Sequence, residues 1–282
     1  MNYRHAYHAG NHADVLKHIV LTRALVHLAR KAKPFRIVDA HAGLGLYDLT
    51  GIEAGKTGEW EGGIGRMTAP FAAEIEALIA PYRQVVAQIN PHGGIERYPG
   101  SPELALRLMR PEDRLVANEL HPADHAALAS RYRNDARVTV TERDALACVK
   151  TSLPPPERRG LVLIDPPYEA KDEAARALSI LEQGLRRFAS GIFMLWYPLK
   201  ADAVAAQILS GAAALGVQAT LQVELRIREA FAGGGLAGSG LVIVNTPWQL
   251  DEDLSLILAA LAQRLGLGAW GQATVKWLVA PA

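Results

Sequence analysis

The sequence predicts an α/β fold in which helices pack on a mostly parallel sheet. Along most of the chain, short apolar runs that suit strands alternate with stretches whose apolar residues recur at helical spacing. The run from Gly160 to Ile164 is apolar without alternation, which is typical of a strand buried on both faces. With 282 residues, 50% of them hydrophobic, the chain is long enough to bury a substantial core as one domain, 1–282.

The first helix is expected from Asn11 to Lys31, where apolar residues repeat at helical spacing. Asn11 is expected as its N-cap, because an Asn side chain can accept hydrogen bonds from the first free backbone N–H groups. Asp14 falls in the first turn, where the helix dipole favours a carboxylate. The first strand is expected to follow over Arg36 to Ala42.

Six further strands are expected, at Leu115–Leu120, Val138–Arg143, Leu161–Ile164, Ile192–Trp196, Leu221–Ile227 and Leu241–Asn245. Helices are expected between or after them, beginning at Pro102, Ala123, Ala145, Asp172, Ala201 and Asp251. The total is about seven strands. The Gly-rich segment 233–240 is expected to join the last two strands as a hairpin.

Segment 48–97 departs from this alternation. It opens with several glycines and then shows a helical apolar face from Phe71 to Ile89. A structureless loop of this length would be improbable in a compact domain. We therefore predict a small, mainly helical insertion after the first strand, beside the active cleft.

Charge and cysteine content exclude several classes of protein. Lys and Arg number 30 against 29 Asp and Glu, and a net charge of +1 argues against a protein that coats nucleic acid nonspecifically. The single cysteine, Cys148, excludes an internal disulfide framework and a thiolate metal cluster. The amino terminus is polar, so no signal peptide is expected, and no apolar run is long enough for a membrane span. A cytoplasmic protein is therefore expected.

The tetrapeptide Asp165-Pro166-Pro167-Tyr168 follows the buried run 160–164, so it lies at the carboxyl end of a strand, where α/β enzymes bind ligands. Asp165 and the Pro166 carbonyl can accept both N–H bonds of a planar exocyclic amine while Tyr168 stacks on its ring. When both N–H groups are held in hydrogen bonds, the nitrogen lone pair becomes available for attack. The motif resembles the signature of amino-methyltransferases that modify adenine N6 or cytosine N4; the alternative is a strand closed by a Pro-Pro turn with a surface Tyr.

Other strand ends offer groups for a nucleoside cofactor. The turn after Val38 carries Gly43 and Gly45, which allow close backbone approach, but the diphosphate fingerprint fails at Asp48, so a nicotinamide-binding fold is disfavoured. Glu119 ends the next strand and can take two ribose hydroxyls, unless it is only a solvated acid.

Two more residues have both a ligand-binding and a capping interpretation. Asp144 ends the third strand and can accept the adenine amine of the cofactor or cap the following helix. Ser101, followed by Pro102, is expected to be an N-cap and also lies over the expected cofactor mouth.

The amino-terminal stretch holds four of the nine histidines. His5, His8 and His12 have spacings compatible with a metal site, but Asp14 is the only nearby acid and no cysteine helps, so no metal is expected. Segment 1–10 is instead interpreted as an RNA-contacting arm, in which Arg4 meets phosphates and Tyr3 stacks on bases. A solvated tail is the alternative.

Taken together, the motifs resemble those of the bacterial ribosomal RNA large subunit methyltransferase J family over nearly the whole chain. The matching segments are His8–His18, Asp39–Gly45, Tyr98–Pro102, Glu119–Pro122, Leu163–Glu169 and Trp196–Pro198. The resemblance implies a Rossmann-like class I methyltransferase fold that uses S-adenosylmethionine. It also implies N6 methylation of one adenine in 23S rRNA, on naked or partly assembled RNA.

The resemblance further implies cofactor contacts by Lys17, His18, His41, Ser101, Glu119, Asp144, Ala145 and Asp165. Asp165 would be the proton acceptor, Tyr3 would meet the RNA, and Lys17 and His18 would close over the cofactor. Ala145 departs from the family, which often has Gly there. Trp196-Tyr197-Pro198 is expected as a second wall beside the adenine, and a monomer is expected. A DNA adenine-N6 methyltransferase and a noncatalytic RNA-binding module remain alternatives.

Overall fold

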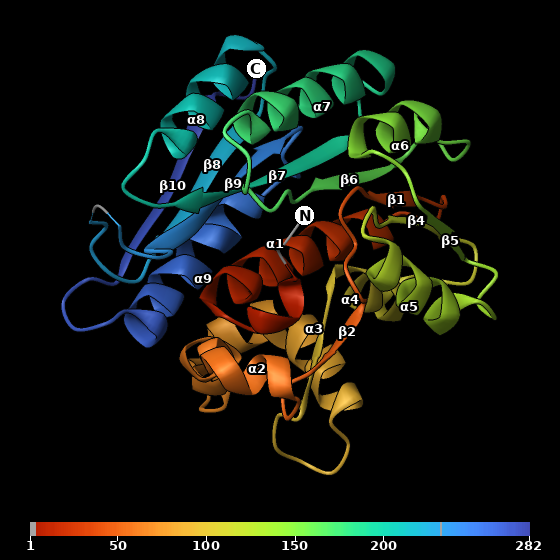
Figure 1. The fold of residues 1–282 in the computed structure, drawn as a ribbon. Helices are drawn as coiled ribbons and strands as arrows, with labels where there is room; N and C mark the ends of the chain where they lie inside the picture. The colour runs from red at the N-terminus through yellow and green to blue at the C-terminus, as the bar shows by residue number, and fades with distance from the viewer. Residues whose placement is uncertain (1–3, 232) are drawn as a thin grey trace.

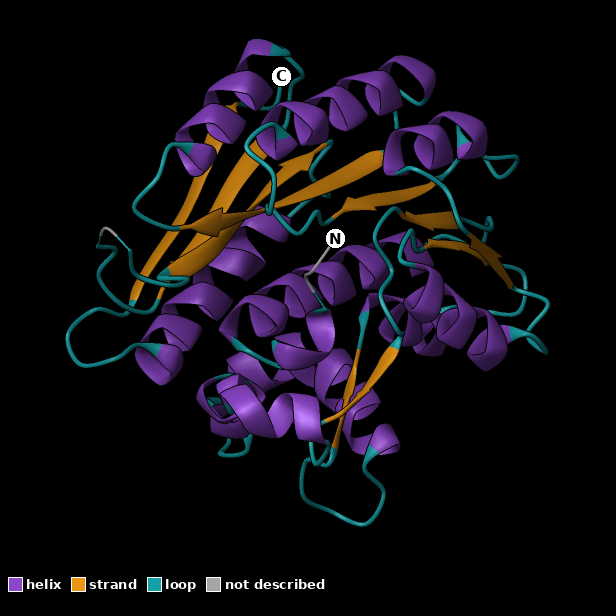
Figure 2. Ribbon diagram, viewed as in Figure 1, coloured by secondary structure: helices purple, strands orange, loops and turns teal. Residues whose placement is uncertain are grey.

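The computed structural model describes residues 4–231 and 233–282 as a three-layer α/β structure (Figures 1 and 2). Within the described residues, the central sheet has eight strands. Their spatial order is β10 (Gln272–Val279), β8 (Thr220–Arg226), β9 (Gly238–Val244), β7 (Ile192–Leu199), β6 (Gly160–Ile164), β1 (Arg36–Asp39), β4 (Arg114–Asn118) and β5 (Val138–Thr141). The α/β prediction is confirmed.

Strands β5, β4, β1, β6 and β7 are parallel neighbours, whereas β9 runs antiparallel to both β7 and β8. Strands β8 and β9 form the hairpin expected from the Gly-rich segment. The expected count of about seven is one short, because β10 pairs antiparallel with β8 at the edge of the sheet. The first strand ends at Asp39 rather than Ala42, since residues 40–45 form the turn that opens the cleft.

Helices cover both faces of the sheet. Successive side chains of each strand point to opposite faces, so a strand such as β1 contributes to two cores. Ile37 packs in a core with α1, α4 and α9, while its neighbour Val38 packs in a second core beneath α6, α7 and α8. The helices of the first face are α1 (His12–Ala29), α4 (Ser101–Leu108), α5 (Pro122–Tyr132) and α9 (Leu250–Leu265). Those of the second are α6 (Ala145–Ser152), α7 (Glu173–Arg187) and α8 (Val204–Ala214).

The segment between β1 and α4 contains α2 (Ile52–Thr57), two 3₁₀ helices (Glu59–Gly62 and Ile64–Met67) and α3 (Ala73–Ile89). A two-stranded ribbon of β2 (Leu46–Asp48) and β3 (Arg97–Pro99) closes its base. Helix α3 packs against α1, α4 and α9, so its apolar face continues the first core (Figure 1).

Two expectations about helix starts have different outcomes. Asn11 is the N-cap of α1, and its Oδ1 accepts hydrogen bonds from the backbone N–H groups of Ala13 and Asp14. Ser101 is not the N-cap of α4: Gly100 takes that place, and Ser101 is the first helical residue. The Ser101 side chain is therefore available to the buried Asp39 carboxyl. Burial raises the pKa of Asp39 to about 7, and the hydrogen bond with Ser101 opposes that shift.

Among the described residues, no helix is long and apolar enough to cross a membrane. The lone cysteine, Cys148, is buried in the second core.

Candidate active site

A cleft of about 630 Å³ opens at the carboxyl ends of β6, β1, β4 and β5. It lies where consecutive crossover helices change from one face of the sheet to the other, the usual ligand site of open α/β sheets. Most of the predicted site residues line it, namely Lys17, His18, His41, Ser101, Glu119, Asp144, Ala145, Asp165, Pro166 and Tyr168. The fold thus brings together residues far apart in the sequence, such as Lys17 and Asp165, which are separated by 148 positions.

Asp165 is the first residue after β6, and two groups from other elements fix it. Its backbone N–H donates to Nδ1 of His41 at 3.1 Å, and its Oδ2 accepts a 2.5 Å hydrogen bond from the Lys17 ammonium. Among the described residues, no donor reaches Oδ1. The carboxylate is therefore held by one oxygen and offers the other to the cleft.

His41 is a neutral acceptor in this contact. Burial lowers the pKa of His41 to about 4, and a backbone N–H can only donate, so its proton must lie on Nε2. His41 follows β1, in the turn where Gly43 has a positive φ of 61°. This positive φ would strain any other residue, and a Cβ at Gly43 would also displace the Tyr47 hydroxyl, which would lie only 2.2 Å away.

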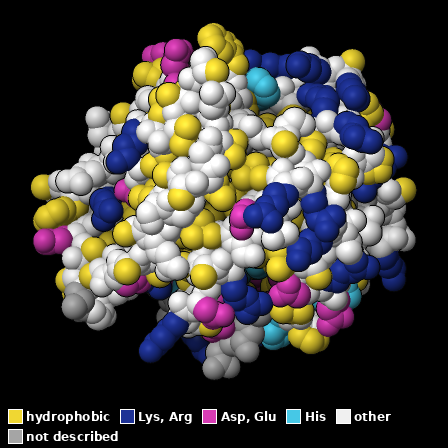
Figure 3. Space-filling view, turned by 90° about the horizontal axis from the view of Figure 1, so that it is seen from above, with side chains coloured by type: hydrophobic (Ala, Val, Ile, Leu, Met, Phe, Trp, Pro, Cys, Tyr) yellow, Lys and Arg dark blue, Asp and Glu magenta, His cyan; other side chains and the backbone are white. Residues whose placement is uncertain are grey.

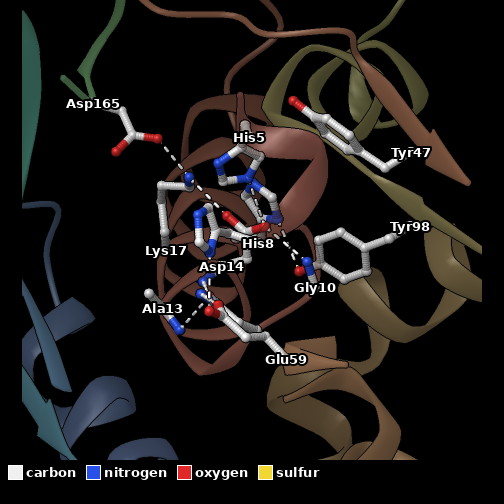
Figure 4. A network of polar contacts seen from close by, with 12 residues as sticks. His5, His8, Gly10, Ala13, Asp14, Lys17, Tyr47, Glu59, Tyr98 and Asp165 are labelled. Carbon is white, nitrogen blue, oxygen red and sulfur yellow. Dashed lines mark hydrogen bonds and ion pairs between the residues drawn. The ribbon is translucent and has the colours of Figure 1, made fainter. Parts of the chain in front are cut away.

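Lys17 lies between two carboxylates, which Figure 4 shows in sequence from Asp165 through Lys17 to Asp14. The Asp14 Oδ1 is 2.9 Å from Nζ, and its Oδ2 accepts from His5 Nε2 at 2.8 Å and from the Gly10 backbone. Burial alone would lower the pKa of Lys17, but Asp14 and Asp165 raise it well above its ordinary value. Burial would also raise the pKa of Asp14, yet His5 and Lys17 hold it well below its ordinary value. Lys17 is thus a buried, permanently charged clamp on Asp165.

Tyr168 is fixed rather than free to swing. Its φ is +53°, a backbone conformation that is costly for an aromatic residue, and its hydroxyl donates to the Trp196 carbonyl at 2.7 Å. The Tyr168 and Trp196 rings are tilted, with centroids 5.8 Å apart. Trp196 and Pro198 line the cleft as expected, but Tyr197 does not. Its hydroxyl donates to Glu224 on the other face of the sheet, because side chains alternate along β7.

The acidic strand ends already use part of their hydrogen-bonding capacity. Glu119 Oε2 accepts from the Gly43 backbone at 2.9 Å, and Oε1 accepts from the His121 backbone at 2.8 Å. Each carboxylate oxygen keeps a further lone pair for a ligand. Burial raises the pKa of Glu119 above its ordinary value.

Asp144 both caps a helix and lines the cleft. Its Oδ1 accepts from the backbone N–H groups of Leu146 and Ala147, so the capping interpretation is right. Its Oδ2 pairs with Arg176 at 3.0 Å and faces the cleft rim. Ala145, beside it, is buried against the cavity.

The amino-terminal arm is folded against the cleft over its described part. Residues His5–Tyr7 form a 3₁₀ helix, and Arg4 pairs with Glu53 at 3.3 Å and with Asp124 at 3.4 Å. A solvated tail is therefore wrong for residues 4–10. Arg4 is held by carboxylates rather than left free for phosphate, and Tyr3 lies outside the described residues.

The three histidines considered for a metal site, His5, His8 and His12, have separate surroundings. His5 bonds Asp14, His8 bonds Glu59, and the buried His12 has a pKa that burial lowers to about 4. Within residues 4–231 and 233–282, no group of three His, Cys, Asp or Glu side chains is placed to hold a metal.

Three comparisons find known proteins that are similar to this chain. Residues 32–279 match the family model described as "Ribosomal RNA large subunit methyltransferase D, RlmJ". Proteins named Ribosomal RNA large subunit methyltransferase J from Haemophilus influenzae and Escherichia coli K12 are 41% and 40% identical to this chain, each over 99% of both chains. A crystal structure from Legionella pneumophila superposes with a TM-score of 0.86 at 32% identity, over 95% of this chain and 98% of that one.

Proposed function

Since the chain belongs to the ribosomal RNA large subunit methyltransferase family whose family model matches residues 32–279, we propose that it transfers a methyl group from S-adenosylmethionine to N6 of one adenine in 23S rRNA. The observation that carries the proposal is the clamped Asp165 at the carboxyl end of β6, with one carboxylate oxygen facing the cleft. The substrate is proposed to be naked or partly assembled RNA.

The cleft suits an adenosine bearing a charged amino-acid group. Its volume is within the range of small-molecule sites, and its lining combines carboxylates, cations and small residues. Glu119 would accept from ribose hydroxyls, while Asp144 and Ala145 would border the adenine. Lys17, His18, His41 and Ser101 would surround the remainder. When bound, S-adenosylmethionine supplies a methyl group activated by its sulfonium.

The protein's part in the reaction is to position the amine and remove its proton. Asp165 Oδ1 and the Pro166 carbonyl would accept the two N6 hydrogens, which directs the nitrogen lone pair toward the methyl group. Tyr168, locked by its bond to Trp196, would stack on the flipped adenine. Asp165 would then take the proton from the ammonium product, which is far more acidic than the starting amine. No step requires a metal.

The rim of the cleft offers cations for the RNA backbone. Figure 3 views the molecule from above, over α6, α7 and α8, and Lys and Arg side chains gather on the side where α6 and α7 lie. Arg143 and Arg176 are exposed and also line the cleft. Such a local patch can bind phosphates in a chain whose net charge is only +1. The arm, with Tyr3 and Arg4, is proposed to add contacts at the opposite rim.

The decisive experiment is methyl transfer from labelled S-adenosylmethionine to three substrates: protein-free 23S rRNA, assembled large subunits and duplex DNA containing adenine. We expect label in free rRNA, recovered as N6-methyladenosine after digestion to nucleosides, and little in the other two. Transfer to DNA instead would identify a DNA adenine methyltransferase. Binding of rRNA without transfer to any substrate would identify a noncatalytic RNA-binding module.

A further inference from the structure

A buried chain of hydroxyl groups joins the 48–97 segment to the cleft. Tyr82 of α3 lies 3.1 Å, oxygen to oxygen, from Tyr98 of β3, and the Tyr98 oxygen lies 2.9 Å from Nδ1 of His18 on α1. The relative exposure of each of the three residues is 1% or less. Because bulk solvent does not reach the two hydroxyl groups, each hydroxyl hydrogen must find its acceptor within the protein.

Two directions of donation are possible, and counting the hydrogens separates them. In the first, Tyr82 donates to Tyr98 and Tyr98 donates to His18, so all hydroxyl hydrogens have acceptors. In the second, His18 donates to Tyr98 and Tyr98 donates to Tyr82. The Tyr82 hydrogen then has no acceptor among the described residues, and a buried unpaired donor is destabilising.

The imidazole carries one proton. Burial lowers the pKa of His18 to about 3, so the ring is neutral at physiological pH. If Nδ1 accepts from Tyr98, the proton must lie on Nε2. His18 also stacks on the Tyr98 ring, with centroids 5.4 Å apart and 25° between the ring planes, which restrains the ring from turning. His18 lines the cleft.

We propose that Tyr98 is a positioning residue that fixes His18 as the Nε2–H tautomer, so that it presents a hydrogen-bond donor to the cleft. The group that it receives is an acceptor oxygen of the bound cofactor, a point that rests on the proposed function. Tyr82, from the 48–97 segment, donates to the far side of the Tyr98 hydroxyl and is not itself needed for the tautomer.

The tautomer can be measured without any cofactor. Long-range ¹H–¹⁵N spectra of the full chain labelled in histidine distinguish a protonated from an unprotonated ring nitrogen, and a His18→Gln variant assigns the signals. We expect His18 to carry its proton on Nε2 and to show an Nδ1 that accepts a hydrogen bond. An Nδ1–H tautomer in the unaltered protein would overturn the proposal, and this test holds even if every tyrosine variant misfolds.

The variants separate positioning from packing. Tyr98→Phe keeps the stacked ring but removes the donor, so the Nδ1 signal should move to that of a nitrogen without a hydrogen bond. The Kd for S-adenosylmethionine, measured by calorimetry, should then rise by about three- to tenfold. Tyr82→Phe is the matched control: Tyr98 can still donate to His18, so the tautomer should persist and Kd should change by less than about threefold.

The outcomes are distinct. Equal losses of thermal stability in both variants, with the His18 signals and Kd unchanged, would show that the tyrosines only pack and would reject the proposal. If the unaltered protein binds no S-adenosylmethionine, the proposed function fails, whereas the spectra still decide the tautomer.

Discussion

The two walls of the cleft hold their charges in different ways. On the α1 wall, Asp14 and Lys17 are almost fully buried, and each is neutralised by opposite charge. On the strand-end wall, Glu119 is held by backbone N–H groups, and Asp144 is 45% exposed. Buried charges without a partner are expensive, whereas exposed or backbone-held ones are not. The α1 wall should therefore be critical for folding as well as function, and the strand-end wall mainly for ligand affinity.

The sharpest test of this contrast is Asp14→Asn, which keeps the shape but leaves Lys17 with one carboxylate. Breaking a buried ion pair costs about 3–5 kcal/mol, so we expect a loss of that order in the free energy of unfolding. Chemical denaturation measures it. As a control, Glu182→Gln removes an exposed helical pair with Arg186 and should cost less than about 0.5 kcal/mol. Equal effects of the two variants would remove the distinction.

The buried pair of Asp14 and Lys17 also predicts that the protein loses stability in acid. The pKa of Asp14 is lower in the folded protein than in the unfolded chain, so its contribution is fully present above the unfolded pKa of about 3.9. It is lost as pH falls through the folded pKa. The stability difference between the unaltered protein and Asp14→Asn should therefore shrink below about pH 4. A difference that stays constant in acid would show that charge is not the cause.

Asp165 belongs to both walls, since it ends β6 and pairs with Lys17. Asp165→Ala should lower turnover at least about a hundredfold, the usual scale for a lost acid–base group. Cofactor affinity should fall much less, and Asp165→Asn, which keeps the shape but cannot take a proton, should be similarly slow. Single-turnover methyl transfer and calorimetry separate the two quantities. Near-normal methylation by either variant would remove Asp165 from the mechanism.

On the strand-end wall, Glu119→Ala should raise the Kd for S-adenosylmethionine by one to two decades, because a hydrogen bond to a charged group contributes roughly 1.5–3 kcal/mol. Stability should change little in comparison with Asp14→Asn. Glu119→Gln keeps one acceptor oxygen and should fall between the two. Calorimetry on folded protein provides the values, and an unchanged Kd for Glu119→Ala would reject the ribose assignment.

The same contrast explains what could be predicted from the sequence. The strand-end residues follow apolar runs directly, so Asp165, Glu119 and Asp144 were predictable from local pattern. The α1 wall depends on contacts over long separations: Lys17 meets Asp165 across 148 positions, which no local pattern reveals. The Tyr82–Tyr98–His18 chain was missed for the same reason.

Three other expectations differ from the structure, at Tyr197, at strand β10 and at the start of α4. Tyr197 could have been assigned correctly, because alternation along a strand places it opposite Trp196 and Pro198. Strand β10 was missed because its residues are half-exposed, and its position comes from pairing with β8. The capping position before α4 was shifted by one residue, since Gly100 also satisfies an N-cap.

The smallest expected effect concerns the arm. Arg4 can meet an RNA phosphate only by leaving Glu53 and Asp124, so the gain from the new contact is largely offset. Arg4→Ala should weaken rRNA binding by less than about threefold and change the slope of log affinity against log salt by less than one.

Arg143→Ala is the matched control: its side chain is exposed at the cleft and has no acidic partner among the described residues, so the slope should become shallower by about one. Binding of a 23S rRNA fragment across a salt series compares them. A steeper loss for Arg4→Ala than for Arg143→Ala would show that the arm releases its carboxylates when RNA binds, and would make the arm, rather than the α6–α7 rim, the main phosphate contact.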